Sequence, residues 1–276
     1  MFGRFAYSGM LFVMSASLTS GLSLELHTCC AQDAVATPPA GFRVLTDVFF
    51  GAQKEPAQQT LTLFMAGVAY DISFDDPNSI TMVDPQRERI VLLNKALKTQ
   101  AVIDLKELQQ FIESARRKAE TTPELAVFLK GADRIAVEAS GVSVGDSALQ
   151  YQATLQKPRE ASMARQYAAY ADALALLNGW QQALPPFARL SLNRVVAEQQ
   201  ALPEEITRTT SSGKQTDVVR CRLHTNGRLS KDDERQVAEI GRMLVSFETV
   251  TVPQFFQALS QTAPAIQVAG QGRAPK

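Results

Sequence analysis

The chain has 276 residues, of which 45% are hydrophobic and 20% are charged, a composition typical of a globular protein of one or two domains. Lysine plus arginine and aspartate plus glutamate both total 28, so the formal net charge is zero. A protein without a basic excess lacks the electrostatic attraction that dominates nucleic-acid binding. The composition therefore argues against a nucleic-acid partner.

The N-terminal segment has the pattern of an export signal. Arg4 provides a short positive region, and a mainly apolar stretch follows over residues 10–24. We expect cleavage after Ala31, with Ala36 as a second choice, because small residues occupy the positions that a signal peptidase reads. Residues 1–31 are therefore predicted to be a signal peptide. The mature chain is predicted to be periplasmic or secreted, with no transmembrane span.

Two alternatives concern the same segment. An uncleaved membrane anchor is disfavoured by Gly21 and Glu25, which interrupt the apolar stretch. Lipid attachment at Cys29 is favoured by the preceding Leu26, but the small residue usually needed directly before the cysteine is missing. We therefore favour a cleaved signal peptide and keep lipid attachment as an alternative.

The mature chain is predicted to consist of a linker over residues 32–43, a single α+β domain over residues 44–262 and a disordered tail over residues 263–276. Short apolar runs separated by turn sequences continue to about Ile103, and they predict an antiparallel meander. The apolar phase changes from odd to even positions at Gly67. We interpret this change as a bulge or bend in a strongly curved sheet.

Helical periodicity begins after the meander. Asp104 can cap a helix, because Glu107 follows three residues later. The apolar face of this helix is expected to consist of Leu105, Leu108, Phe111, Ile112, Ala115 and Ala119. A shorter helix is expected to begin at Pro123, because proline suits the first helical turn.

The remaining elements alternate between strands and helices. In chain order we expect strands over residues 134–139 and 149–156, joined by a turn at 145–147, and then helices over about 160–177 and, after Pro185-Pro186, to about Gln200. A hairpin with its turn at 211–214 and a helix that is capped by Ser230 and runs to Leu244 are expected to follow. Helices between blocks of hairpin-linked strands indicate the α+β class. The predicted fold is a curved antiparallel sheet, made of a meander plus hairpins, that packs against several amphipathic helices.

The run YDISFDDPNSITMVDPQRERIVLLNKALKTQAVID, together with LQQFIESARRKA, resembles uncharacterised exported bacterial proteins. The succession of a curved meander and covering helices is similar to the periplasmic lipoprotein carriers, which have an open half-barrel. This resemblance spans roughly residues 44–250 and implies an apolar concavity that holds acyl chains under helices. It assigns no functional residue, and the chain departs from that plan by placing two helices between Glu160 and Gln200.

Five aromatic residues are candidates for lining a ligand cavity: Tyr70, Phe74, Tyr167, Tyr170 and Trp180. The competing interpretation is ordinary core packing, which is the more frequent role of aromatic residues at helical spacing. We predict no catalytic residue, no cofactor and no metal site, because phosphate-binding loops and the common Cys and His motifs are absent from the sequence.

The stretch VVRCRLH brings a cysteine and a histidine close together in the sequence. Its alternation predicts a strand that points Cys221 and His224 to opposite faces. The two side chains would then neither form a catalytic dyad nor share a metal, since both require converging heteroatoms. After signal cleavage Cys221 would be the only cysteine, so we expect no intramolecular disulfide.

These observations predict an exported, non-catalytic envelope protein that binds lipid or another apolar ligand, or a protein partner. The alternative is a carboxylate-dependent hydrolase of the cell envelope. The hydrolase would need two carboxylates that face each other in one cleft, and the candidates are Asp75, Asp76, Asp84 and Asp104. Asp75 and Asp76 also form part of an ordinary turn sequence.

Overall fold

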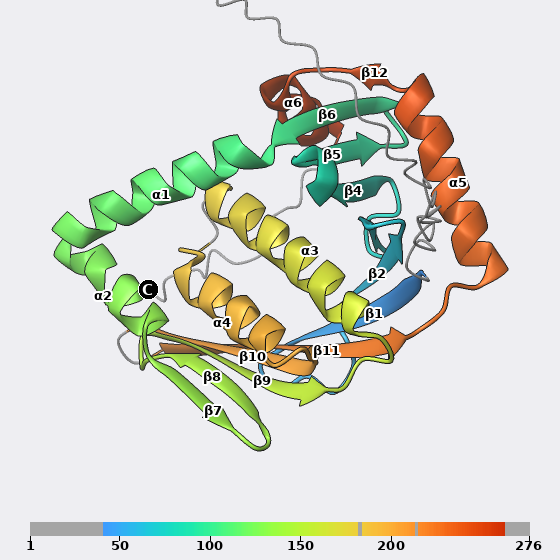
Figure 1. Ribbon diagram of the computed structural model, residues 1–276. Coiled ribbons are helices and arrows are strands. Elements are labelled where there is room, and N and C mark those ends of the chain that lie inside the picture. The colour runs from blue at the N-terminus through green and yellow to red at the C-terminus, as the bar shows by residue number, and fades with distance from the viewer. Residues whose placement is uncertain (1–40, 182–183, 213–214, 263–276) are drawn as a thin grey trace, which may run out of the picture. The chain divides into compact units, whose positions relative to one another are not determined.

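Twelve strands form one open, curved sheet in this computed structural model, which describes residues 41–181, 184–212 and 215–262 (Figure 1). The predicted α+β class with an antiparallel sheet is therefore confirmed. Every strand pair in the described residues is antiparallel except β12 (Glu248–Thr249) with β6 (Thr99–Asp104). The predicted signal peptide and C-terminal tail lie outside the described residues.

The sheet consists of two meanders that meet at the first strand. The first meander contains β1 (Phe42–Phe50), β2 (Gln58–Met65), β3 (Val68–Ser73), β4 (Ser79–Asp84), β5 (Arg89–Asn94) and β6. The second contains β7 (Ile135–Glu138), β8 (Gly141–Gly145), β9 (Leu149–Gln156), β10 (Leu202–Ser212) and β11 (Gln215–Asn226). β1 pairs with β2 on one edge and with β11 on the other, which gives the order β12-β6-β5-β4-β3-β2-β1-β11-β10-β9-β8-β7.

Of the predicted bulge or bend at Gly67, the structure shows a bend: the chain reverses direction there in a hairpin turn between β2 and β3, and no residue bulges out of a continuous strand. Ala66 and Gly67 form the turn with φ angles of 52° and 80°. Two-residue turns with positive φ at both positions match the twist of the flanking strands. Such a turn pairs odd with even positions, as in Leu63 with Tyr70, which reproduces the phase change without an extra residue.

Six α-helices lie in the described residues: α1 (Leu105–Thr121), α2 (Pro123–Ala132), α3 (Ala161–Trp180), α4 (Phe187–Glu198), α5 (Lys231–Ser246) and α6 (Val252–Thr262). As predicted, Asp104 caps α1 by accepting a hydrogen bond from the Lys106 amide at 2.7 Å. Ser230 and Asp233 form the predicted capping box of α5. Phe111 was assigned to the apolar face of α1, but its side chain is 43% exposed.

Other boundaries differ from the sequence predictions. β1 begins at Phe42, two residues inside the predicted linker, and the sequence analysis missed β8, β12 and α6. The turn at residues 145–147 joins β8 to β9, whereas β7 and β8 form a separate hairpin. α3 continues through Gly179 to Trp180, beyond the predicted end at about residue 177. A Cβ atom at Gly179 would lie 2.9 Å from Pro186 and 3.0 Å from Ile112, so glycine permits close packing there.

The curved sheet has an apolar core on each face. The larger core lies on the concave face, where α3 and α4 occupy the interior of the curve and α1 and α2 pack beside them (Figure 1). The smaller core lies on the convex face of β2 to β5, where Val237 and Ile240 of α5 pack against the sheet. This division explains why both odd and even positions of the first meander are apolar.

Aromatic contacts fix α3 against the concave face. Phe42 and Phe64 stack with ring centroids 4.1 Å apart. Tyr170 of α3 meets Phe64 edge-on at 5.5 Å, and Tyr167 meets Tyr170 at 6.1 Å. Such arrangements contribute about 0.5–1.5 kcal/mol per pair beyond area burial. They hold the two tyrosines at a defined height above the strands.

Candidate ligand-binding pocket

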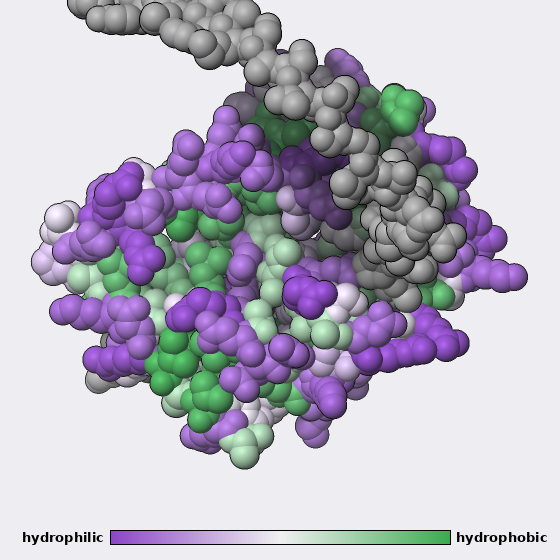
Figure 2. All heavy atoms as spheres, in the orientation of Figure 1, coloured by the Kyte–Doolittle hydropathy of each residue, from purple (hydrophilic) through white to green (hydrophobic). Residues whose placement is uncertain are grey.

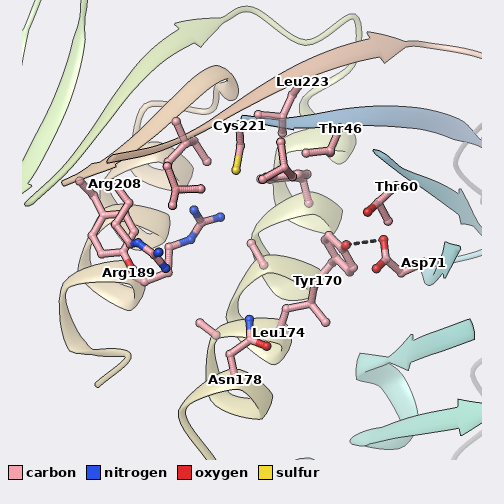
Figure 3. A pocket seen from close by; sticks show the side chains of 17 residues that line it. Thr46, Thr60, Asp71, Tyr170, Leu174, Asn178, Arg189, Arg208, Cys221 and Leu223 are labelled. Carbon is pink, nitrogen blue, oxygen red and sulfur yellow. Dashed lines mark hydrogen bonds between the residues drawn. The ribbon is translucent and has the colours of Figure 1, made fainter. Parts of the chain in front are cut away.

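A pocket of about 350 Å³ lies where the two meanders join, between the concave face of the sheet and helices α3 and α4 (Figure 3). The sheet contributes Thr46, Val48, Thr60, Asp71, Tyr151, Ile206, Arg208, Val219, Cys221 and Leu223. The helices contribute Tyr167, Tyr170, Ala171, Leu174, Ala175, Asn178 and Arg189. The pocket thus depends on segments from both halves of the domain.

The pocket extends across the sheet and not along one strand. Its lining includes residues of β3, β2, β1, β11 and β10, which are consecutive neighbours. Adjacent strands are about 4.8 Å apart, so β3, which carries Asp71, and β10, which carries Arg208, are about 19 Å apart across the strands of the curved sheet. Val48 of β1 and Val219 and Leu223 of β11, two strands that lie between β3 and β10, contribute apolar side chains to the lining.

One end of the pocket holds a buried carboxyl group. Oδ1 of Asp71 accepts hydrogen bonds from the Tyr170 hydroxyl and from the Thr62 hydroxyl, each at 2.7 Å (Figure 3). Burial raises the pKa of Asp71, although both hydrogen bonds act to lower it. Burial and the charge of Asp71 also hold the pKa of Tyr170 well above its usual value, so its hydroxyl remains a donor.

The other end holds two guanidinium groups. Arg208 projects from the inner face of β10, and Arg189 projects from the first turn of α4 (Figure 3). Burial raises the pKa of Tyr151, while the positive charges of both arginines act to lower it. The same three influences act on the pKa of Cys221, where burial also dominates. Both guanidinium groups therefore lie close to Tyr151 and Cys221.

The prediction for VVRCRLH is confirmed. Cys221 lies on the inner face of β11 and lines the pocket, and burial raises the pKa of its thiol. His224 lies on the outer face, where its Nε2 is 3.0 Å from Oδ2 of Asp47. The sheet separates the two side chains, so they form neither a dyad nor a metal site. Among the described residues, no group of three or more His, Cys, Asp or Glu side chains could hold a metal ion.

The five aromatic candidates occupy different environments. Tyr167 and Tyr170 line the pocket. Tyr70 lies on the convex face and packs against the smaller core, Phe74 is half exposed, and Trp180 packs against Phe256 of α6. Only the two tyrosines of α3 are therefore placed to contact a ligand in this pocket.

The carboxylates considered for a hydrolase have separate structural roles. Asp75 accepts a hydrogen bond from the Gln59 amide, and Asp76 accepts one from the Asn78 amide within the β3–β4 turn. Asp84 is buried and pairs with Arg87 at 3.0 Å and with Arg89 at 3.5 Å, while Asp104 caps α1. In the sheet register Arg89 lies between Asp84 and Asp104. None of the four carboxylates lines the 350 Å³ pocket.

Sequence reasoning missed the three charged residues of the pocket. Arg208 is two residues after the buried Ile206 on the same strand, so the two side chains point to the same face. This spacing is the sequence signal that would have placed the charge of Arg208 inside the fold. Asp71 likewise alternates with Tyr70 and Ile72 on the opposite face. Arg189 carries no comparable signal, because α4 is apolar on more than one side.

The surface seen in Figure 2 is largely hydrophilic with several apolar patches. The terminal strand of the sheet, β7, exposes Ile135 and Val137, the latter by 51%. Exposed edge strands can pair with another chain, so β7 is a possible location for the protein-partner prediction. No helix in the described part of the chain is long and apolar enough to cross a membrane.

Comparisons with known proteins give no family assignment. No protein-family model matches the chain, and no curated protein is significantly similar to it in sequence. Functional inference therefore rests on the pocket itself.

Proposed function

We propose that the protein binds a small molecule with a mainly apolar body in the pocket between the concave face and helices α3 and α4. This proposal rests on the size and lining of the pocket. Its volume of about 350 Å³ falls in the range of roughly 300–1,000 Å³ that small-molecule sites occupy. An apolar lining with a few polar groups at defined positions is typical of such sites.

The shape and chemistry of the pocket favour binding over catalysis. Cys221 has no histidine beside it, and the carboxyl group of Asp71 is engaged by Tyr170 and Thr62. The guanidinium groups lie at the opposite end from Asp71, so an acid and a base do not converge on one point. We therefore propose a carrier or sensor role, without chemistry on the ligand.

We also propose that the protein acts in the periplasm or outside the cell, after removal of the signal peptide. The export pattern of residues 1–31 supports this location. The resemblance to periplasmic lipoprotein carriers supports the same compartment and an apolar ligand. A protein partner at β7 stays a prediction, since the exposed edge gives a location but no partner chemistry.

Ligand binding can be tested with a fluorescent fatty acid and a pair of strand variants. Val219→Trp fills the pocket from β11 and should abolish probe binding. Val218→Trp adds the same side chain on the opposite face and should leave binding unchanged, because adjacent strand residues point to opposite sides. Circular dichroism would show that both variants fold.

Native mass spectrometry of protein purified from its own host provides an independent test. A copurified small molecule that Val219→Trp removes would support the proposal. Failure of the wild-type protein to bind the probe, together with the absence of any copurified molecule, would contradict it.

A further inference from the structure

We infer that the ligand is a single-chain amphiphile whose anionic end, a carboxylate, binds between Arg189 and Arg208 while its apolar chain runs across the sheet toward β3. This inference rests on the proposed function, since it requires that the pocket hold a ligand. It adds the chemical class of the ligand and its orientation.

The strand register directs Arg208 into the pocket. Arg208 pairs with Val219 of β11 on one side and with Tyr151 of β9 on the other, and all three residues line the pocket. Arg189 reaches the same end from α4. A strand and a helix thus present two planar cations to one space, and guanidinium groups are well suited to hold a carboxylate through paired hydrogen bonds.

Inside the protein these arginines interact with tyrosine hydroxyls, Arg208 with Tyr151 and Arg189 with Tyr167, and not with a carboxylate in an ion pair. Neither Arg189 nor Arg208 forms an ion pair with a described carboxylate, and the buried Nε of Arg208 has no hydrogen-bond partner among the described residues. Asp172 is near enough for Arg189 to lower its pKa, but burial raises that pKa more strongly, and its Oδ1 accepts from the Asn193 side chain at 2.9 Å. A buried donor without a partner is costly, and a bound carboxylate would satisfy it.

Two other arginines also have a buried Nε without a hydrogen-bond partner, but their environments differ from that of Arg208. Arg89 lies 3.5 Å from Oδ2 of Asp84, and Arg220 lies over the ring of Phe49 with its Cζ 4.8 Å from the centroid. Each of these cations therefore has a favourable interaction within the protein. Arg208 has neither an ion pair nor an aromatic stacking partner among the described residues. Its interaction is with the neutral Tyr151 hydroxyl, and it faces a pocket large enough for a ligand.

The end of the pocket that holds Asp71 determines the orientation of the ligand. The oxygen atoms of Asp71 repel an anion when the group is ionised and accept hydrogen bonds in either state. A molecule with one anionic end is therefore favoured with that end at the arginines, four strands away from Asp71 in the sheet. A second anionic group at the far end would be disfavoured.

The test compares decanoate with decanol by isothermal titration calorimetry, at concentrations where neither forms micelles. The wild-type protein should bind decanoate about ten- to a hundred-fold more tightly than decanol, since hydrogen bonds to charged groups are worth this much. Arg208→Met should remove most of this preference and leave the affinity for decanol unchanged, whereas Arg208→Lys should retain part of it.

Arg220→Met is the matched control. It removes the same charge from the neighbouring strand but on the outer face, and it should leave the preference for decanoate intact. Arg189→Met provides a second pocket variant if Arg208→Met does not fold. Equal affinities for decanoate and decanol in the wild-type protein would overturn the anionic-end inference while the proposed function stands. Binding of neither molecule would overturn the anionic-end inference, and it would overturn the proposed function as well if no small molecule copurifies with the protein.

Discussion

Asp71 is a charged residue that the fold places in an unfavourable environment. In the folded protein burial raises its pKa, and the hydrogen bonds from Thr62 and Tyr170 only partly offset this effect. The folded state therefore binds its proton more tightly than the unfolded state does. Between the two pKa values the free energy of unfolding falls as the pH rises, so ionisation of Asp71 destabilises the protein toward neutral pH.

Asp71→Asn should remove this penalty. Asparagine keeps an oxygen that can accept from Tyr170 and Thr62, but it carries no charge. Relative to the wild type, the variant should gain stability as the pH rises from about 4, near the unfolded pKa, to about 7. Urea unfolding at both pH values measures the difference, and a relative stability that is independent of pH would contradict the account.

For single residues, the sequence can predict the face of the sheet to which a strand side chain points. The alternation in VVRCRLH was sufficient to separate Cys221 from His224, because a strand has a fixed period of two. The same rule would have directed Arg208 and Asp71 inward, but an inward charge conflicts with the expectation that charged residues are exposed. The partners that make such a position possible come from distant segments, and a local pattern does not contain them.

At the scale of elements, Asp233 stabilises α5 through the capping box at its N-terminus and through an ion pair with Arg43 of the sheet. Asp233 accepts hydrogen bonds from the Ser230 amide and hydroxyl, both at 2.8 Å, and from Arg43 of β1 at 3.0 Å. Burial alone would raise the pKa of Asp233, but these hydrogen bonds and the charge of Arg43 together lower it. The carboxylate therefore stabilises the fold above its unfolded pKa, and this contribution is lost as the pH falls toward the folded value.

Asp233→Asn should destabilise the protein by about 1–3 kcal/mol at neutral pH, because it weakens both the cap and the link to Arg43. The loss should become smaller as the pH falls below the unfolded pKa of about 4, because the stabilising effect of the wild-type charge is then progressively lost. This pH dependence is opposite in sign to that of Asp71→Asn, so the two variants serve as controls for each other. Equal losses above and below this pKa would show that Asp233 acts without its charge.

The β2–β3 turn provides a test of the hairpin at Gly67. Gly67→Val should cost about 1–3 kcal/mol, because valine disfavours positive φ and its Cβ would lie 2.9 Å from the Gln86 side chain. Gly241→Ala is the control. Gly241 is in α5 with no heavy atom near the Cβ position, so alanine should be neutral or stabilising. An unchanged melting temperature for Gly67→Val would contradict the turn geometry.

Element boundaries were predictable where a local rule dominates. Asp104 and Ser230 mark the starts of α1 and α5, since capping depends on neighbouring residues alone. The predicted end of α3 at about residue 177 was too early. A glycine near a helix end commonly marks the terminus, but Gly179 lies inside α3 and allows close packing. β8 was missed because its sequence, GVSVG, contains the glycines that usually mark turns.

At the scale of the whole molecule, the decisive feature is the pairing of β1 with β11. Residues about 180 positions apart in sequence, such as Asp47 and Arg222, become neighbours there. This pairing joins two meanders into one curved sheet, and α3 and α4 cover the junction. The sequence predicted curvature and covering helices, but the location of the pocket depends on a long-range register that no local pattern specifies.

Occupation of the pocket can be measured directly through Cys221, whose thiol lines the pocket beside Arg208. The experiment follows alkylation of Cys221 in the native protein by peptide mass spectrometry while decanoate is titrated. The account predicts that labelling is slow without ligand, that decanoate slows it further in proportion to occupancy, and that Arg208→Met shifts this protection to higher decanoate concentration. Saturating decanoate that leaves the rate of Cys221 labelling unchanged would contradict the account.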